Sequence, residues 1–104
     1  MKLYELAKSI RSKNAGPFTL TIDILFEDEE TFRRTVAANA LNRALIADIY
    51  EVPEEQVEHY ICEEARAIKF SFPRPVAAGD FGDRDVFGGQ FHSPLVNLDV
   101  PVER

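Results

Sequence analysis

The sequence predicts an α+β fold, in which a mainly antiparallel sheet carries two or three helices on one face. Two observations lead to this prediction. Apolar and polar residues alternate over 18–26 and again over 68–72, which is the pattern of strands with one buried face. Between them lie two segments with helical spacing of apolar residues, each preceded by a residue that can cap a helix. Strands followed by helices and then by strands are typical of the α+β class.

The N-terminal part begins with a segment whose secondary structure the sequence leaves open. Residues 3–10 place their apolar side chains at spacings that fit either a helix or a strand. The polar stretch RSKNAGPF, residues 11–18, has the composition of a turn. The regular alternation over 18–26 that follows predicts the first clear strand.

Two helices and a shorter third one are predicted in the middle of the chain. Asp28 is placed to cap the first, and Glu29 and Glu30 follow it in the first turn, where the helix dipole favours negative charge. Asn42 is placed to cap the second helix. Pro53 suits the start of a brief third helix.

The C-terminal part predicts further strands around one long loop. A strand pattern returns from about His59 and ends at Pro73 and Pro75, because proline cannot donate a ladder hydrogen bond. The glycine-rich loop over 76–94 is long for a plain connection between strands. The alternation over 96–102 predicts a last strand.

Composition limits the classes of function. A chain of 104 residues with 45% hydrophobic residues predicts one globular domain over 1–104. Its net charge of −6 argues against binding to nucleic acid or to an anionic membrane. No apolar run is long enough to span a bilayer, no signal-peptide pattern is visible, and one cysteine cannot form an internal disulfide. We therefore expect a cytoplasmic protein without a cofactor.

The stretch 11–18 is the first candidate site. Arg11 can grip a carboxylate or phosphate through two hydrogen bonds, and Lys13 adds a point charge. Asn14 tolerates left-handed backbone, and Gly16 allows a ligand to approach the main chain closely. The alternative is a charged turn that leads into the next strand without binding anything.

The glycine-rich loop is the second candidate site. Its polar residues, together with one that precedes it, are Arg74, Asp80, Asp83, Arg84, Asp85, Gln90 and His92. The spacing of the aspartates lacks the pattern of an EF-hand calcium loop, although a metal site of another geometry stays an alternative. We expect instead a network in which Asp83 and Asp85 hold Arg84 and shape a binding loop.

The remaining reactive side chains give one candidate for catalysis. His92 follows the glycines and suits acid–base work or a hydrogen bond to a ligand, although ordering of the loop is the alternative. His59 is expected to be structural, and Cys62 is expected to be a packing residue. The chain has no phosphate-binding loop, nucleophile elbow, dinucleotide fingerprint or zinc spacing.

Three blocks of this sequence resemble a small family of short bacterial proteins known as a domain of unknown function. The blocks are KLYELAKSIRSKNAGPFTLTIDILFED, AIKFSFPRP and GDRDVFGGQFHSPLVNLDVP, and the likeness covers essentially the whole chain. Members of that family accompany the large acyclic-terpene-utilisation protein of the AtuA type, as a neighbouring chain or a fused segment. The resemblance therefore implies a context in the catabolism of branched or unsaturated acids.

The chain also resembles, more distantly, the C-terminal ferredoxin-like domain of AtuA-type proteins. There a leucine-rich start runs into an Arg-Ser-Gly-Asp-Lys-Gly stretch, and a later strand precedes a glycine-rich segment. Arg11, Ser12, Lys13 and Gly16 match that stretch, whereas the Gly and Asp between Ser and Lys are missing here. This likeness implies a ferredoxin-like two-layer sandwich.

Together these features predict a small accessory subunit that acts with an AtuA-type large protein, with coenzyme A thioesters or small acids as ligands. The loops 11–18 and 74–93 are expected to form one anion-binding site. Its predicted residues are Arg11, Ser12, Lys13, Asn14, Gly16, Arg74, Asp83, Arg84, Asp85, Gln90 and His92. Two alternatives stay open: a stand-alone hydratase, dehydratase or isomerase that uses His92, and a purely structural oligomerisation subunit. A homo-oligomer is compatible with each.

Overall fold

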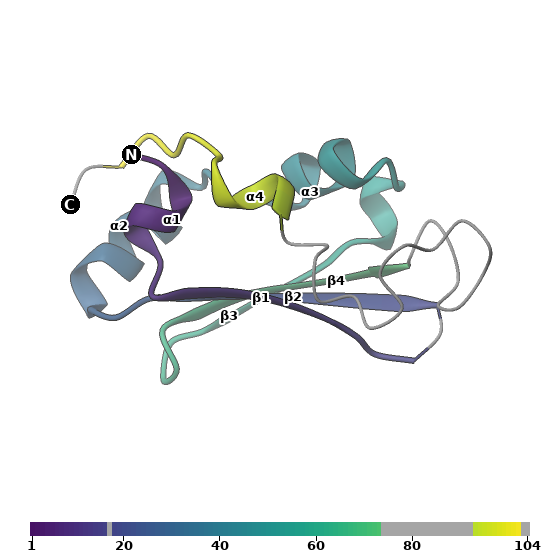
Figure 1. Cartoon of the computed structure of the whole chain (residues 1–104), viewed down its shortest axis with the longest axis horizontal. Helices are drawn as coiled ribbons and strands as arrows, with labels where there is room; N and C mark the ends of the chain where they lie inside the picture. Colours follow the sequence, from purple (N-terminus) through teal and green to yellow (C-terminus); the bar gives the residue numbers. More distant parts are fainter. Residues whose placement is uncertain (17, 74–92, 103–104) are drawn as a thin grey trace.

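Two β-hairpins form one layer of the molecule, a four-stranded antiparallel sheet (Figure 1). The computed structural model describes residues 1–16, 18–73 and 93–102. The strands are β1 (Ser9–Asn14), β2 (Thr19–Leu25), β3 (Glu58–Cys62) and β4 (Ala67–Pro73), in the spatial order β1-β2-β4-β3. Strands β2 and β4 are therefore central, and β1 and β3 lie at the edges of this sheet.

The helices form the second layer and lie on one face of the sheet (Figure 1). They are α1 (Leu3–Leu6), α2 (Glu29–Ala38), α3 (Arg43–Tyr50), the 3₁₀ turn η1 (Glu54–Gln56) and α4 (Ser93–Val96). Both predicted caps are confirmed. The Asp28 side chain accepts a hydrogen bond from the Thr31 amide at 2.9 Å, and Asn42 accepts one from the Leu45 amide at 2.9 Å. Each cap satisfies a backbone donor that the first turn leaves without a partner.

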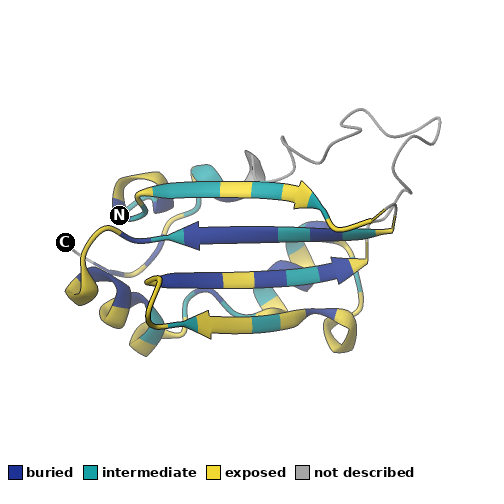
Figure 2. Ribbon diagram, turned by 90° about the horizontal axis from the view of Figure 1, so that it is seen from below, coloured by how far each residue is buried: buried dark blue, intermediate teal, exposed yellow. Residues whose placement is uncertain are grey.

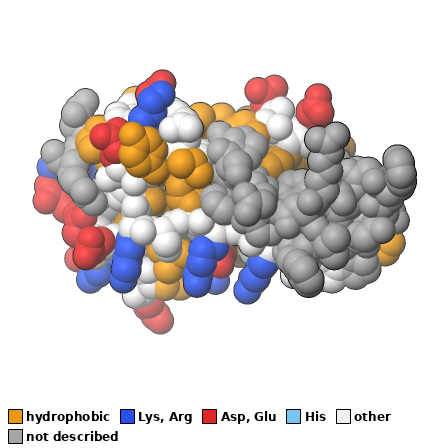
Figure 3. All heavy atoms as spheres, viewed as in Figure 1, with side chains coloured by type: hydrophobic (Ala, Val, Ile, Leu, Met, Phe, Trp, Pro, Cys, Tyr) orange, Lys and Arg blue, Asp and Glu red, His pale blue; other side chains and the backbone are white. Residues whose placement is uncertain are grey.

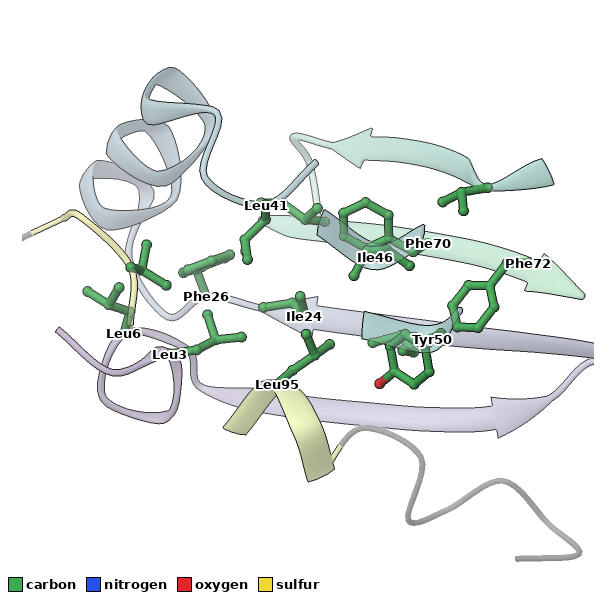
Figure 4. Close-up of a cluster of buried hydrophobic side chains, with 14 of the residues drawn as sticks. Leu3, Leu6, Ile24, Phe26, Leu41, Ile46, Tyr50, Phe70, Phe72 and Leu95 are labelled. Carbon is green, nitrogen blue, oxygen red and sulfur yellow. The ribbon is translucent and has the colours of Figure 1, made fainter. Parts of the chain in front are cut away.

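The core lies between the layers and is built from cross-strand pairs of β2 and β4. Leu20 is opposite Phe72, Ile22 opposite Phe70 and Ile24 opposite Ile68. Helical side chains cover these pairs, among them Tyr50, whose ring lies 4.8 Å from that of Phe72 (Figure 4). The other labelled members of the cluster are Leu3, Leu6, Phe26, Leu41, Ile46 and Leu95. Full burial of each such side chain contributes about 1.5–3 kcal/mol.

The structure answers the open question about residues 3–10 and corrects the turn predicted over 11–18. Residues 3–6 form α1, and strand β1 already begins at Ser9 and runs to Asn14. The first four residues of RSKNAGPF therefore belong to a strand, and the turn starts only after them. An edge strand pairs on one side only, so charged side chains such as Arg11 and Lys13 are common there.

The last predicted strand, over 96–102, is wrong. Residues 93–96 form α4, and within the described residues the segment that follows makes one isolated bridge, between Lys2 and Asp99. A proline fits the first turn of a helix, which suits Pro94 as the second residue of α4. Pro101 has no N–H group with which to extend a ladder. The alternating burial nevertheless holds, since Val100 and Val102 are buried while Pro101 is exposed.

The predicted α+β two-layer sandwich is confirmed, and its connectivity is now defined. Strands β1 and β2 form one hairpin and β3 and β4 form the other, and both α2 and α3 lie in the connection from β2 to β3. Ferredoxin-like proteins have a β-α-β-β-α-β order instead. In the described part of the chain, no helix is long and apolar enough to cross a membrane.

Candidate functional site

The structure divides the first predicted site between the two faces of the sheet. Side chains alternate along β1, so Arg11 and Lys13 lie on one face and Ser12 and Asn14 on the other. Gly16 lies in the turn that follows, with a φ of 96°, a left-handed conformation that glycine adopts without strain. Arg11 and Lys13 therefore lie on the same face, whereas Ser12 and Asn14 lie on the opposite face and Gly16 lies in the turn.

The second predicted site falls on a part of the chain that the structure leaves undescribed. Its residues Arg74, Asp83, Arg84, Asp85, Gln90 and His92 all lie outside the described residues. The predicted meeting of the two loops therefore stays a prediction. The site that the described residues do define is built around Arg11 and Lys13.

The face of the sheet opposite the helices is here called the open face. Among the described elements, no helix covers it (Figure 2). The strand register places Arg11 opposite Asp23, and Asp23 opposite Lys69 of β4. This row of three charged side chains crosses β1, β2 and β4 and is here called the charged row. In the neighbouring row, Lys13 is opposite Thr21.

Asp23 is the most unusual residue of the charged row. It is only 7% exposed, although no described helix covers this face. Its Oδ2 atom lies 3.8 Å from Nη2 of Arg11, whereas its buried Oδ1 has no hydrogen-bond partner among the described residues. The residues directly opposite it, Arg11 and Lys69, have long side chains of the kind that can cover a neighbouring group.

The cost of this arrangement suggests a function for Asp23. A buried polar atom without a partner costs about 1–3 kcal/mol, and aspartate is disfavoured in strands. Among the described residues, no hydrogen bond at Oδ1 offsets this cost. A group that is costly to the fold and close to cations is a candidate for ligand binding.

The charge of the open face differs in sign from that of the whole chain. The strands place three cations on this face, Arg11, Lys13 and Lys69, and two carboxylates, Asp23 and Glu58. This leaves one positive charge, whereas the chain as a whole carries −6. Figure 3 shows Lys and Arg side chains along the sheet side of the molecule. The strand residues of this face therefore favour the approach of an anion.

A second polar region is a shallow pocket of about 410 Å³ beside the edge strand β3. It is lined by Asn39, Asn42, Arg43, Ala44, Glu54 and His59. Two of these side chains already have structural roles. Asn42 caps α3, and Nη2 of Arg43 donates to the Glu54 carbonyl at 2.9 Å.

His59 is structural, as the sequence predicted, because its ring stacks on Phe70 with centroids 4.6 Å apart. Burial, and secondarily the positive charge of Arg43, lower the pKa of His59 below its usual value of 6.5. The imidazole is therefore neutral at pH 7. Its Nε2 atom is buried without a partner among the described residues. Most of this pocket is thus explained by the packing of the helical layer, which leaves the open face as the better site.

Sequence reasoning found two of the open-face cations and missed Asp23 and Lys69. The signal was present, because an aspartate at the centre of an otherwise apolar and β-branched strand is unusual. The alternation of β4 likewise separates the exposed Lys69 from its buried neighbours Ile68 and Phe70. Among the described residues, no three His, Cys, Asp or Glu side chains cluster in a way that could hold a metal ion.

Fold and site together define a class: an α+β two-layer sandwich in which the sheet face without a described helix carries a charged row around a buried carboxylate. Comparison with known proteins gives the family. The chain matches the model of a domain of unknown function, DUF4387, over residues 3–99, and it belongs to that family. No curated protein and no solved structure matches it.

Proposed function

We propose that this chain is a small accessory subunit that binds an acidic ligand on the open face of its sheet. The observation that carries the proposal is the grouping of Arg11, Lys13 and Lys69 on one face of a protein that is otherwise acidic. A carboxylate or phosphate gains charge-assisted hydrogen bonds from such groups, which are about twice as strong as those between neutral partners.

Two of the three cations have no ion-pair partner among the described residues. Lys13 and Lys69 have no carboxylate within 4.0 Å there, and Arg11 reaches Asp23 only at 3.8 Å. By contrast, Arg33 and Arg34 pair with Glu29 and Glu30 along helix α2, and Lys2 pairs with Asp99. The charge of the open face is thus available to a ligand.

The proposed partner is a large protein of the AtuA type, and the proposed ligands are branched or unsaturated acids or their coenzyme A thioesters. The resemblance of the three sequence blocks supports this partner. The absence of a described helix over the open face is compatible with a subunit that presents its ligand to another protein.

Binding of butyrate and of butyryl-coenzyme A, measured by isothermal titration calorimetry, tests the proposal. We expect Lys13→Ala and Lys69→Ala each to weaken binding about tenfold, the usual effect of losing a hydrogen bond to a charged group. The affinity should also fall as salt is added, because exposed charges are screened.

Arg33→Ala is the matched control, since it removes an exposed cation from the helical layer. It should leave the affinity unchanged. Equal losses in Arg33→Ala and in the two open-face variants would show that only the net charge matters and would contradict the proposed site. Co-purification with the AtuA-type protein of the same organism tests the partner separately.

A further inference from the structure

We propose that the ligand of the open face is a short hydroxy acid, whose hydroxyl group donates a hydrogen bond to Oδ1 of Asp23. The inference rests on the proposed function and adds the chemical class of the ligand. The atom that suggests this ligand is Oδ1 of Asp23, which is buried and accepts no hydrogen bond from any described residue. A buried carboxyl oxygen in this state lacks a donor, and a ligand is one source of it.

The surroundings of Asp23 set the charge of that donor. Asp23 has a cation directly opposite it on each neighbouring strand, Arg11 on β1 and Lys69 on β4. A ligand ammonium group near Oδ1 would be repelled by both cations, whereas a neutral hydroxyl would not be. The donor that fits is therefore a hydroxyl group, and an amino acid is disfavoured.

The same row sets the size of the ligand. The guanidinium Nη2 of Arg11 lies 3.8 Å from Oδ2 of Asp23. A hydroxyl on Asp23 and a carboxylate held by Arg11 therefore lie close together in the ligand. This spacing fits a hydroxyl on the second or third carbon of the acid.

In this proposal, a ligand reaches Oδ1 when a side chain beside it moves. The Arg11 side chain is 65% exposed, so it can change rotamer without disturbing the core. A change of rotamer at Arg11 or Lys69 would expose the Asp23 carboxylate. The same side chain would then contact the carboxylate of the bound acid. The backbone of the three strands need not change.

The test compares three probes of the same length: 3-hydroxybutyrate, butyrate and 3-aminobutyrate, each as the free acid and as the coenzyme A thioester. We expect the hydroxy compound to bind about tenfold more tightly than butyrate, which is the usual gain from one hydrogen bond to a charged group. A preference seen among the free acids would identify the ligand as a free acid, and a preference seen among the thioesters would identify it as a coenzyme A thioester.

Substitution of Asp23 should abolish the preference without abolishing binding. In Asp23→Ala the ratio of the two affinities should fall to about one. Asp23→Asn, which keeps the size and one acceptor oxygen, should give an intermediate ratio and serves if the alanine variant does not fold. Asp99→Ala is the matched control, since it removes an aspartate that pairs with Lys2 away from the open face. It should keep the full preference.

The outcomes separate the two proposals. Equal binding of butyrate and 3-hydroxybutyrate, still weakened by Lys13→Ala, would overturn the hydroxy-acid inference and leave the anion site intact. Tighter binding of 3-aminobutyrate would also overturn the inference, in favour of an amino acid. No binding of any probe, in either form, would overturn both proposals.

Discussion

The two faces of strand β4 show how differently this sheet is used on its two sides. Towards the helices β4 presents Ile68, Phe70 and Phe72, each at most 1% exposed. Towards the open face the same strand presents Lys69 and Ser71. The first set is explained by packing alone, whereas the second contributes little to the fold. The difference teaches that the hydrophobic core lies on one side of the strand, so that substitutions on the two sides should have very different effects on stability.

The largest expected effect tests this contrast with two neighbouring residues. Phe70→Ala removes a fully buried ring that also stacks on His59, so the free energy of unfolding should fall by about 3–5 kcal/mol. Lys69→Ala, one residue away on the open face, should change it by no more than about 0.5 kcal/mol. Urea unfolding of both variants measures the two values. Similar losses would show that the open face is as important for stability as the core.

A smaller effect of opposite sign is expected at Asp23. Asp23→Thr replaces a buried carboxylate, one oxygen of which has no described partner, by a residue that favours strands. We expect the free energy of unfolding to rise by about 1 kcal/mol, because the cost of the unsatisfied atom is removed. The same urea titration measures it. A clear loss of stability would mean that Asp23 has a structural role and would contradict the view that its unpartnered oxygen is kept for a ligand.

The smallest effect concerns the pH dependence of stability and His59, which lies on the edge strand β3 opposite Phe70. The pKa of His59 is lowered in the folded protein, chiefly by burial, so the unfolded chain binds a proton more readily. The contribution of His59 to stability is therefore complete above the unfolded pKa of 6.5 and is lost as the pH falls below it. His59→Gln should show a weaker decrease in the free energy of unfolding between about pH 7.5 and 5.5.

The control for this measurement is the wild-type protein over the same range, because carboxylates titrate in both proteins and cancel in the difference. If the wild type and His59→Gln lose stability in parallel, His59 is not shielded from protonation in the folded state.

The elements that the sequence predicted correctly are those in which local pattern and tertiary packing agree. Strand β2 alternates because one side packs on helices, and Asp28 and Asn42 cap the helices that the pattern placed after them. Where the two disagree, the prediction was wrong. Among the described strands, β1 pairs with β2 alone. An edge strand of this kind can carry many polar residues, and its sequence then has the composition of a turn.

The final segment was misassigned for a related reason. Alternating burial over 96–102 arises from an extended chain packed on the core, but a strand also needs a neighbour to pair with. The residues of the candidate site were likewise predicted only in part. Arg11 and Lys13 were visible as cations, whereas Lys69 joins them only through the pairing of β4 with β2, which no local pattern reveals.

The central pairing of β2 with β4 has a kinetic consequence. Each hairpin forms from segments that are close in sequence, whereas β2 meets β4 only after the connection containing α2 and α3 has closed. Contacts of this kind are slow to form. The charged row crosses that junction, so it is complete only when the two halves of the chain have docked. A ligand that bridges Asp23 and Lys69 would hold the hairpins together and slow their separation during unfolding.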